Sequence, residues 1–475
     1  MNIAIVGAGV SGLLVAYKLK QQADNAAVYI YDKTDRIGGN VDTRNFRVGQ
    51  SYVSHKEAHR WADMGVNDFN LTQYRNIYDL LNKFGFKKGV ELLKLENSTS
   101  FSNEDGSISY YINEDGSNTM SEIVSKDYQR FQRHAPEYVL TNHKSHNKTV
   151  EDYLNEHNYS EEFREQNLYP RINGMYFVNG THPKDMPIKA VMDYYGLQEG
   201  FGHEKKPYRV YLKDGMSSWI QKLYEHCGAK LITVDHLDVL ANPDNAIISS
   251  NKGDHKFDAV FICCHADTAD KIIKTGKTEK MKSVFGAYKY NDSTAIAHTY
   301  SSVLPPDRAA WKTYNIYIHN KKQKKRPYTI SYVCNRHQND KENPSFDHFE
   351  NPEYFVSLNP HKEIPDKFIL KDEKGNPMIQ NFRHNVVDFK VLDYQKDKTV
   401  LSMQGENNLY FAGGWVIGAG LHEQCYEAAH QAVTKFIHKE VDFDRYYYTP
   451  GAPPEEYAPK YLREKFSHFF DRSES

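Results

Sequence analysis

The pattern of apolar and polar positions at the start of the chain predicts a strand, a turn, a helix and a second strand, in that order. Residues 3–6 form an apolar run that predicts a strand, and apolar positions recur at helical spacing over residues 13–19. A second apolar run, residues 27–31, ends in the carboxylate of Asp32. The pattern therefore predicts a strand–helix–strand unit whose first turn covers residues 7–12.

Three glycines occupy that turn at the spacing Gly-x-Gly-x-x-Gly. Gly7 permits a tight turn, Gly9 lets the backbone approach a pyrophosphate, and Gly12 lets the helix pack closely on the sheet. The first turn of the helix then faces the phosphates with unpaired N–H groups, and Asp32 accepts hydrogen bonds from a ribose diol. We therefore expect a dinucleotide-binding site; the alternative is a glycine turn that serves packing alone.

A second glycine-rich segment follows the second strand. It reads Lys33-Thr-Asp-Arg36-Ile-Gly38-Gly39-Asn40, with a basic residue ahead of a glycine pair. NAD dehydrogenases do not need such a segment, whereas a second backbone loop at this point suits FAD held extended across the domain. The alternative is a surface turn with a solvated arginine.

The dinucleotide motif, the acid at its end and the Arg-x-Gly-Gly loop together resemble the fingerprint of the flavin-containing amine oxidase superfamily over residues 1–45. The resemblance implies FAD as the cofactor and a segment through Gly65 and Val66 that passes near its flavin ring. It also implies that an edge strand near His236 lies by the adenine and that His265 lies near the pyrophosphate. An incidental loop histidine is the alternative for His265.

The C-terminal part of the chain carries another strand–turn–helix pattern. Residues 408–412 predict a buried strand that runs into Gly413, Gly414 and Trp415, and a helix opens at residues 420–423. Small residues on one face of that helix let it pack tightly on a cofactor or a sheet, and its N-terminus can stabilise negative charge on a reduced flavin. The alternative is a strand–loop–helix crossover without a ligand.

Two distant parts of the chain thus each carry part of one cofactor site, which implies a discontinuous domain with a second domain inserted. We predict an α/β fold (α+β overall), with a Rossmann-like FAD-binding domain and an inserted substrate domain of helices and a mostly antiparallel sheet. The FAD-binding domain is expected at residues 1–70, 207–285 and 395–440, the substrate or cap domain at 71–206 and 286–394, and a tail at 441–475. The residues expected to bind FAD are Gly7, Gly9, Val10, Ser11, Gly12, Asp32, Lys33, Arg36, Gly38, Gly39, Asn40, Gly65, Val66, His236, His265, Gly413, Gly414, Gly420, Leu421 and His422.

The motif Gly418-x-Gly420-x-His422-Glu423 departs from the usual amine-oxidase ending, which has further glycines. Together with residues 297–311 it resembles a bacterial branch known only as predicted NAD/FAD-binding proteins. That branch is similar to flavin-dependent polyenoic fatty acid isomerases and to the oxidase-like N-terminal part of plant cyclopropane fatty acid synthases. The Arg-Ile-Gly-Gly-Asn loop also resembles UDP-galactopyranose mutases, from which the His422-Glu423 ending differs.

The composition indicates a large soluble enzyme with no electrostatic preference for nucleic acid, since the 475 residues carry a formal net charge of −2. No apolar run reaches the roughly 18–20 residues of a membrane-spanning helix. The N-terminal stretch lacks the pattern of a signal peptide, so we expect a cytoplasmic location. Five cysteines argue against a disulfide framework, and no Cys/His spacing predicts a metal site.

The leading hypothesis is an FAD-dependent oxidoreductase that transfers a hydride from a small organic substrate to flavin N5, as an amine-oxidase-like oxidase or a desaturase. The alternatives are a redox-neutral, flavin-dependent double-bond isomerase of an unsaturated fatty acid and a non-catalytic flavin-binding protein. Trp415, His422 and Glu423 are expected on the flavin face, with Tyr176 and Lys289 on the substrate side. Helix capping and cofactor binding are alternative roles for His422 and Glu423. The expected partner is a small-molecule substrate, and the tail can pack on the body or, in a homodimer, on a second subunit.

Overall fold

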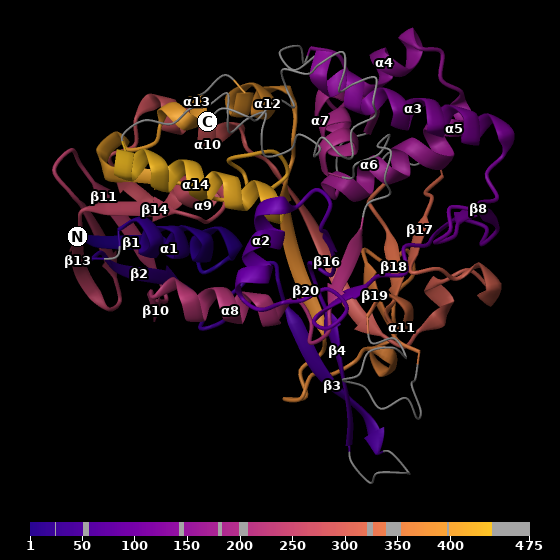
Figure 1. Cartoon of the computed structure of the whole chain (residues 1–475), viewed down its shortest axis with the longest axis horizontal. Helices are drawn as coiled ribbons and strands as arrows, with labels where there is room; N and C mark the ends of the chain where they lie inside the picture. The colour runs from indigo at the N-terminus through magenta and orange to yellow at the C-terminus, as the bar shows by residue number, and fades with distance from the viewer. Residues whose placement is uncertain are drawn as a thin grey trace.

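The structure is a computed structural model of the chain in which two units lie side by side (Figure 1). One unit holds a parallel sheet with helices packed on it, and the other holds helices above a larger, mostly antiparallel sheet. The expected tail at 441–475 lies outside the described residues. The structure describes residues 1–23, 25–50, 57–141, 147–178, 183–198, 208–320, 326–338, 353–396 and 399–438.

Five parallel strands form the central sheet of the first unit, in the order β10-β2-β1-β14-β21. All residues of β14 and β21 and four of the five residues of β1 are buried. Both faces of the sheet are covered, which explains why these strands read as nearly continuous apolar runs. The strands are β1 (Asn2–Val6), β2 (Ala27–Asp32), β10 (Lys230–Thr233), β14 (Ala259–Ile262) and β21 (Leu409–Phe411).

Helix α1 packs against both α8 and α14 at the side of this sheet (Figure 1). A glycine at position 12 is required for α1 to start where it does, because a Cβ atom there would lie 1.9 Å from the carbonyl oxygen of Gly7. Ala428, Ala429 and Ala432 of α14 are fully buried, so that helix also approaches its neighbours closely. The helices of this unit include α1 (Val10–Gln22), α2 (Arg75–Lys83), α8 (Ser217–Cys227) and α14 (His422–His438).

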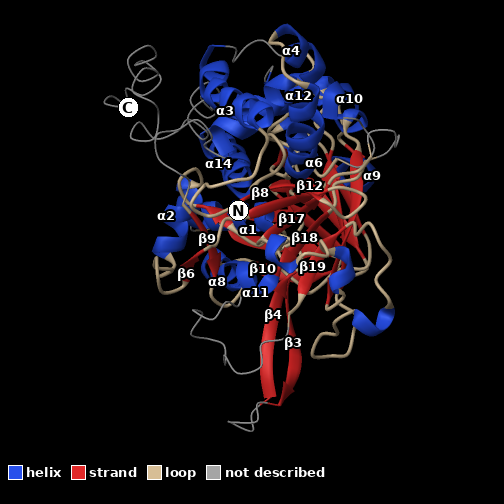
Figure 2. Ribbon diagram, turned by 90° about the vertical axis from the view of Figure 1, so that its right-hand side faces the viewer, coloured by secondary structure: helices blue, strands red, loops and turns tan. Residues whose placement is uncertain are grey.

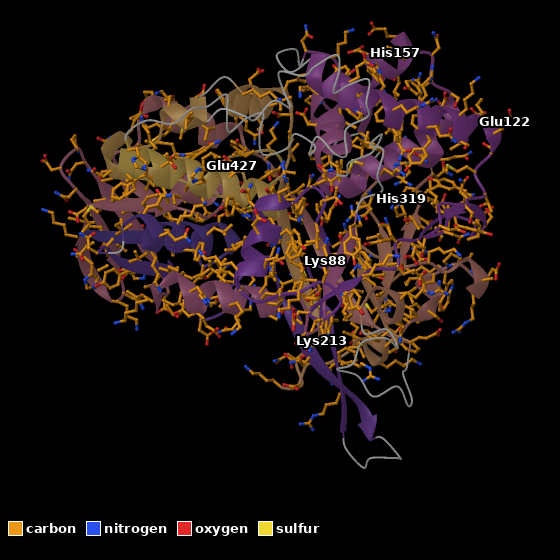
Figure 3. All side chains as sticks on the ribbon, viewed as in Figure 1. Lys88, Glu122, His157, Lys213, His319 and Glu427 are labelled. Atoms are coloured by element: carbon orange, nitrogen blue, oxygen red, sulfur yellow. The ribbon has the colours of Figure 1, made fainter. Side chains whose placement is uncertain are left out.

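A pair of charged side chains is buried where α1 meets α14. Lys18 and Glu427 are each 4% exposed, and the Lys18 ammonium lies 3.7 Å from the centre of the Tyr426 ring. Burial disfavours charge on both groups, so it lowers the pKa of Lys18 to about 8 and raises that of Glu427 to about 8. Glu122, in contrast, lies exposed on the outside of the second unit (Figure 3).

A smaller sheet, in the order β13-β12-β11-β15, carries the chain between β10 and β14 and on toward the second unit. Its first three strands are antiparallel, whereas β11 and β15 are parallel. Val239, Ile248 and Ile273 of this sheet are fully buried together with residues of β14 and β21, so the two sheets share one core. The elements are β11 (Leu237–Ala241), β12 (Ala246–Ser250), β13 (Gly253–Phe257), α9 (Ala266–Ile272), β15 (Ile273–Thr275) and α10 (Glu279–Ala287).

The second unit is built on a seven-stranded sheet in the order β20-β16-β19-β18-β17-β7-β8. All its pairings are antiparallel except that of β17 with β7. The predicted fold class, a Rossmann-like unit combined with a mostly antiparallel sheet and helices, is confirmed, while the domain boundaries stay predictions. The strands are β7 (Thr99–Ser102), β8 (Ile108–Ile112), β16 (Tyr290–His298), β17 (Tyr314–Tyr317), β18 (Ile330–Val333), β19 (Phe355–Leu358) and β20 (Ile379–Asn385).

The helices of the second unit enclose an aromatic core of their own, which includes Phe131, Tyr153 and Phe163. The helix that leads into α6 opens into a π-helical turn at Arg164–Leu168, next to Pro170. Proline has no N–H to donate to the preceding turn, which explains the wider winding at this point. The helices are α3 (Glu122–Thr141), α4 (Val150–Glu156), α5 (Glu161–Phe163), α6 (Tyr169–Tyr176) and α7 (Ile188–Asp193).

A hairpin of β3 and β4 extends away from the body of the molecule (Figure 2). Next to it lies a three-stranded sheet in the order β5-β9-β6. Among the described helices, none is both long and apolar enough to span a bilayer. The remaining elements are β3 (Thr43–Gln50), β4 (Glu57–Asp63), β5 (Phe69–Asn70), β6 (Leu92–Lys94), β9 (Arg209–Leu212), α11 (Cys334–His337), α12 (Phe389–Lys396) and α13 (Thr399–Ser402).

Two glycine substitutions test the packing of α1 against β1. Gly12→Ala places a methyl group against the Gly7 carbonyl, and we expect it to destabilise the protein by about 3 kcal/mol or more. Gly286→Ala is the matched control, because no heavy atom lies within 4 Å of a Cβ at that helical position. It should stabilise the protein by about 0.5–1 kcal/mol. Urea-induced unfolding measures both values, and a Gly12→Ala protein as stable as wild type would contradict this packing.

Candidate functional site

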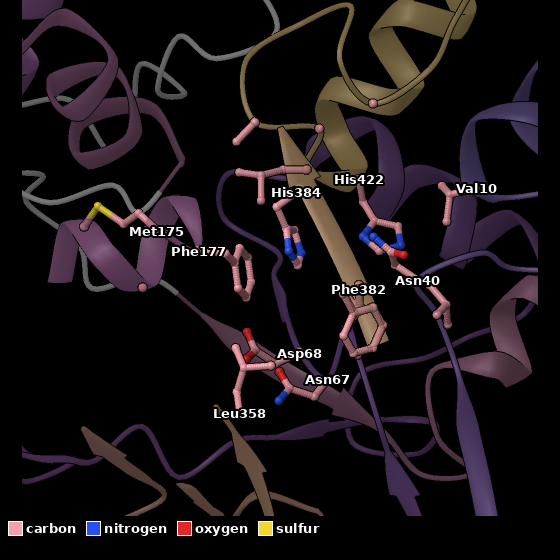
Figure 4. A pocket seen from close by; sticks show the side chains of 18 of the residues that line it. Val10, Asn40, Asn67, Asp68, Met175, Phe177, Leu358, Phe382, His384 and His422 are labelled. Carbon is pink, nitrogen blue, oxygen red and sulfur yellow. The ribbon is translucent and has the colours of Figure 1, made fainter. Parts of the chain in front are cut away.

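A cavity of about 1530 Å³ extends from the glycine turn of β1–α1 to the seven-stranded sheet. Its walls come from both units, as Figure 4 shows for Val10 and Asn40 on one side and Met175 and Phe177 on the other. The cavity therefore has one end at the Rossmann-like sheet and another in the second unit.

Two backbone loops meet at the first end of the cavity. Gly9 and Gly38 form an isolated parallel bridge, and the Gly38 N–H donates to the Ala8 carbonyl at 2.8 Å. Arg36 stabilises the second loop by donating to the carbonyl oxygens of Val41 at 2.9 Å and Gly39 at 2.8 Å. Arg36 thus holds the loop in shape and is not among the residues that line the cavity.

Gly9 differs from the other glycines of the turn because the protein itself does not require it. Its φ is −72°, which any residue adopts, and a Cβ atom would have only the Gly39 Cα as a neighbour, at 3.8 Å. Gly9 nevertheless lines the cavity, and no described side chain caps the first turn of α1. An open backbone with free N–H groups at a helix N-terminus fits the pyrophosphate of a dinucleotide.

Asp32 ends β2 on the wall of the same cavity. Its Oδ2 accepts from the Ala8 N–H at 2.8 Å and its Oδ1 accepts from the Thr34 N–H at 3.1 Å. Oδ1 also accepts from the Thr34 hydroxyl at 3.4 Å. A carboxylate oxygen has two lone pairs, so Oδ2 can accept a further hydrogen bond from a ribose hydroxyl. The position at the carboxyl end of the second strand is the one that a dinucleotide's ribose requires.

The C-terminal glycines pack against the protein's own backbone. A Cβ at Gly420 would lie 2.4 Å from the Gly414 carbonyl oxygen, and one at Gly413 would lie 2.6 Å from the Cys264 carbonyl oxygen. The Trp415 indole N–H donates to the same Cys264 oxygen at 3.0 Å. This turn therefore brings the N-terminus of α14 to the cavity, and the Trp415 indole forms a wall whose polar atom is already bonded.

The structure brings most of the expected site residues together around the cavity. The expected residues outside its lining are Gly12, Arg36, Gly413, Tyr176, Lys289 and Glu423. Those that line it are Gly7, Gly9, Val10, Ser11, Asp32, Lys33, Gly38, Gly39, Asn40, Gly65, Val66, His236, His265, Gly414, Trp415, Gly420, Leu421 and His422.

Tyr176 and Lys289 were expected on the substrate side, and neither lines the cavity. The Tyr176 hydroxyl donates to the Ala190 carbonyl at 2.7 Å inside the helical core. Lys289 is exposed, at the end of the segment between α10 and β16. A contact of either side chain with a substrate thus has no support in the structure.

Glu423 caps a neighbouring helix. Its Oε1 accepts from the N–H of Asn76 at 2.9 Å and from the Asn76 side chain at 2.6 Å, and its Oε2 accepts from the Ile77 N–H at 3.1 Å. These donors lie in the first turn of α2, which no side chain of its own N-cap residue satisfies. Glu423 therefore joins α14 to α2, while the adjacent His422 points to the cavity.

His422 presents a neutral ring to the cavity. It is 6% exposed and packs edge-on against Phe69, with the ring centres 5.1 Å apart. Burial lowers the pKa of His422 to about 3, and its Nε2 has no hydrogen-bond partner among the described residues. A buried ring nitrogen without a partner at a cavity wall is a site where a ligand can form a hydrogen bond.

A buried carboxylate that the sequence motifs did not identify lies further along the cavity. Asp68 accepts from Arg209 at 2.6 Å and from the Tyr314 hydroxyl at 2.8 Å, and His337 Nε2 lies 3.6 Å away. Burial alone would raise the pKa of Asp68, but the Arg209 guanidinium and His337 hold it well below its usual range. Asp68 is therefore an ionised, fully paired group. It joins β9 of the three-stranded sheet, through Arg209, to β17, through Tyr314.

Phe177 and His384 form a flat aromatic surface in the same region (Figure 4). Their rings stack with centres 3.7 Å apart and planes 8° apart, and burial lowers the pKa of His384 to about 3. Phe177 ends α6 with φ +49°, a left-handed conformation that is rare for a bulky residue. Such strain is typical of functional positions, and the sequence alone carries no sign of it.

The N-terminal part of the chain is similar in sequence to known proteins. Residues 5–84 match the NAD(P)-binding Rossmann-like domain family. Over 108 residues, which are 23% of this chain and 17% of its relative, the chain is 33% identical to the zeta-carotene desaturase of Arabidopsis thaliana. Over 63 residues, 13% of this chain and 10% of the relative, it is 32% identical to the FAD-binding monooxygenase moxY of Dothistroma septosporum.

Solved structures are similar over nearly the whole chain. The CLA-producing fatty acid isomerase from P. acnes matches with a TM-score of 0.64 and 15% identity, over 91% of this chain and 98% of that one. Cyclohexylamine oxidase from Brevibacterium oxydans matches with a TM-score of 0.63 and 13% identity, over 92% and 99%. The chain shares the fold of these two enzymes. The resemblance seen in the sequence is confirmed at this level.

The role of Glu423 as a cap leads to a prediction about stability. Glu423→Gln leaves one acceptor oxygen where two are used, and we expect it to destabilise the protein by about 1–3 kcal/mol near pH 5.5. Glu279→Gln is the control, because that carboxylate is 89% exposed.

The pH dependence of this difference has a defined sign. Burial raises the pKa of Glu423 to about 7, from an ordinary value of 4.5. The folded state therefore retains a proton that the unfolded chain releases, so this contribution to stability is full below pH 4.5 and is lost as the pH rises through 7. The deficit of Glu423→Gln should thus narrow between pH 5.5 and pH 8 in urea titrations; a deficit that widens would contradict this account.

Proposed function

We propose that this chain is an FAD-dependent oxidoreductase that acts on a small organic substrate. One observation carries the proposal: the cavity that begins at the open backbone of Gly9 continues without interruption to the aromatic wall of the second unit. A cavity of about 1530 Å³ exceeds the roughly 300–1,000 Å³ of a typical ligand pocket, so it has room for a large cofactor and a substrate together.

The residues that would hold FAD lie along the first half of the cavity. Gly9 and the N-terminus of α1 suit the pyrophosphate, and the carboxylate of Asp32 suits the adjacent ribose. The loop through Gly38 and Gly39 would cover the other side of the dinucleotide. The Nε2 of His422, at the N-terminus of α14, has no partner among the described residues and would form a hydrogen bond with the cofactor.

The chemistry would depend on the cofactor, since FAD when bound supplies a hydride acceptor and a two-electron reservoir. The side chains of this chain position the substrate and exclude water. His422 and His384, both with pKa values lowered to about 3, stay uncharged at neutral pH. Together with Phe177 and Phe382 they surround this part of the cavity with neutral rings (Figure 4).

A second candidate function is redox-neutral isomerisation of a double bond in an unsaturated fatty acid. The similarity to a fatty acid isomerase and the apolar walls at Met175 and Leu358 favour it. The two functions differ in electron balance, because oxidation gives a product two electrons poorer and isomerisation gives a product of unchanged mass. A non-catalytic flavin-binding protein is the third candidate.

The cofactor assignment is tested with Gly9→Ala. The added methyl group meets no protein atom closer than 3.8 Å, so the variant should fold and melt like the apoprotein. It should, however, crowd the pyrophosphate and be purified without the absorbance near about 450 nm of oxidised flavin. Gly286→Ala should retain that absorbance, and full flavin content in Gly9→Ala would contradict the placement of FAD.

The reaction class is tested by mixing the purified protein anaerobically with cyclohexylamine, with amino acids and with linoleate. Bleaching of the flavin together with a product two units lighter in mass supports the oxidoreductase. A conjugated product of unchanged mass overturns it in favour of the isomerase. A third outcome is that dithionite bleaches the flavin, but none of the organic compounds bleaches it or is isomerised. That outcome overturns both enzymatic functions in favour of the non-catalytic protein.

A further inference from the structure

Arg171 is a charged residue on the cavity wall that neither the fold nor the proposed chemistry uses. It lies in α6, one residue after Pro170, in a stretch that is otherwise apolar, aromatic or neutral. It is half-buried and lines the cavity. Its exposed part therefore faces the space in which a substrate would lie.

No carboxylate pairs with Arg171 among the described residues. Its guanidinium carbon lies 4.9 Å from the centre of the Tyr128 ring and 5.1 Å from that of Phe101, and its Nε has no hydrogen-bond partner in the described part of the chain. Its electrostatic partners are the hydroxyl groups of Tyr128, Tyr110 and Tyr195, and the Tyr110 hydroxyl also accepts from Asn167 at 2.9 Å. An arginine is always protonated, so this wall of the cavity carries an uncompensated positive charge.

Two other charged groups on the cavity wall, one of them the partly exposed Arg383, are compensated. Asp68 is paired with Arg209 at 2.6 Å, and Arg383 is paired with Asp267 at 2.7 Å. Aromatic rings around a cation offset part of the free-energy cost of its burial, but a buried cation without an anion remains unfavourable. An anionic group of a ligand would therefore neutralise the charge of Arg171.

Apolar side chains contribute to the cavity wall between Arg171 and the flavin end, beside the carboxylate of Asp68 that is paired with Arg209. Met175 follows Arg171 by one turn of α6, and Phe177 ends that helix against His384. Ile330 and Leu358 of the antiparallel sheet line the same cavity. A ligand that reaches from Arg171 toward the flavin therefore has hydrocarbon surface available to it at these residues.

We propose that Arg171 binds the carboxylate of a substrate whose remaining part is an apolar chain directed toward the flavin. This inference rests on the proposed function and narrows its substrate class to apolar monocarboxylates. The planar guanidinium matches a carboxylate with two parallel hydrogen bonds, and Tyr128 and Phe101 hold its plane in place. A protonated amine would be repelled at this position, so the charge distribution argues against simple alkylamines as substrates.

The test compares three eight-carbon probes that differ only in the head group: octanoate, octan-1-ol and octylamine. Titration into the purified flavoprotein is followed by calorimetry and by the shift of the flavin absorbance band. Octanoate should bind, and the alcohol and the amine should bind about tenfold or more weakly, as expected for loss of a charge-assisted pair.

Three variants assign the effect to Arg171. Arg171→Met should weaken octanoate binding about 10- to 100-fold and leave octan-1-ol binding unchanged. Arg171→Lys keeps the charge without the planar fork, so it should lie between wild type and Arg171→Met. Arg133→Met, an exposed arginine of α3 outside the cavity lining, should bind all three probes like wild type. If Arg171→Met does not fold, the Arg171→Lys titration decides.

The outcomes separate this inference from the proposed function. Three results would overturn the role of Arg171 even if the flavin is present and active. The protein could bind octanoate and octan-1-ol equally, it could prefer octylamine, or the Arg171→Lys and Arg171→Met variants could bind octanoate as tightly as wild type. A purified protein without flavin would overturn the proposed function, while the calorimetric preference for octanoate would still report on Arg171.

Discussion

The close approach of α1 to β1 is the contact on which the rest of the structure depends. At Gly12 the helix lies so near the Gly7 carbonyl that a Cβ would be only 1.9 Å from its oxygen. That approach sets the position of α1 between α8 and α14 and so brings the C-terminal helix to the same end of the sheet as the glycine turn. Because β1 pairs with both β2 and β14, strands from distant parts of the chain then form one cavity wall.

The glycines of the site serve two different purposes, and only their surroundings distinguish them. Gly12 and Gly420 are required by the protein itself, since a side chain at either position would overlap a neighbouring carbonyl. Gly9 has an ordinary φ and open space beside it, so packing within the protein does not require a glycine there and the space can admit a ligand. The same contrast applies to the charged groups: Asp68 has Arg209 as its partner within the protein, whereas Arg171 faces the cavity with aromatic rings only.

Several side chains singled out in the sequence make contacts that no local pattern indicates. Glu423 was expected at the flavin face, but it bonds to the first turn of α2, about 347 positions earlier in the chain. Lys289 was expected near the substrate and is exposed. Asp68, Arg171 and Phe177 were not singled out, although a lone charge in an apolar stretch, as at Arg171, is a signal that could have found that residue. The partners of these groups belong to other elements, so the sequence around each residue does not specify its role.

The sequence by itself determined the Rossmann-like unit, the mostly antiparallel character of the second sheet and most of the residues that line the cavity at the glycine turn of β1–α1. It could do so because turn geometry, strand periodicity and helix N-termini depend on residues close together in the chain. Tertiary structure alone decided which charges are paired, which glycines face open space and which walls enclose the cavity in the second unit. Those properties depend on distances between segments that are hundreds of residues apart, and such distances exist only once the chain has folded.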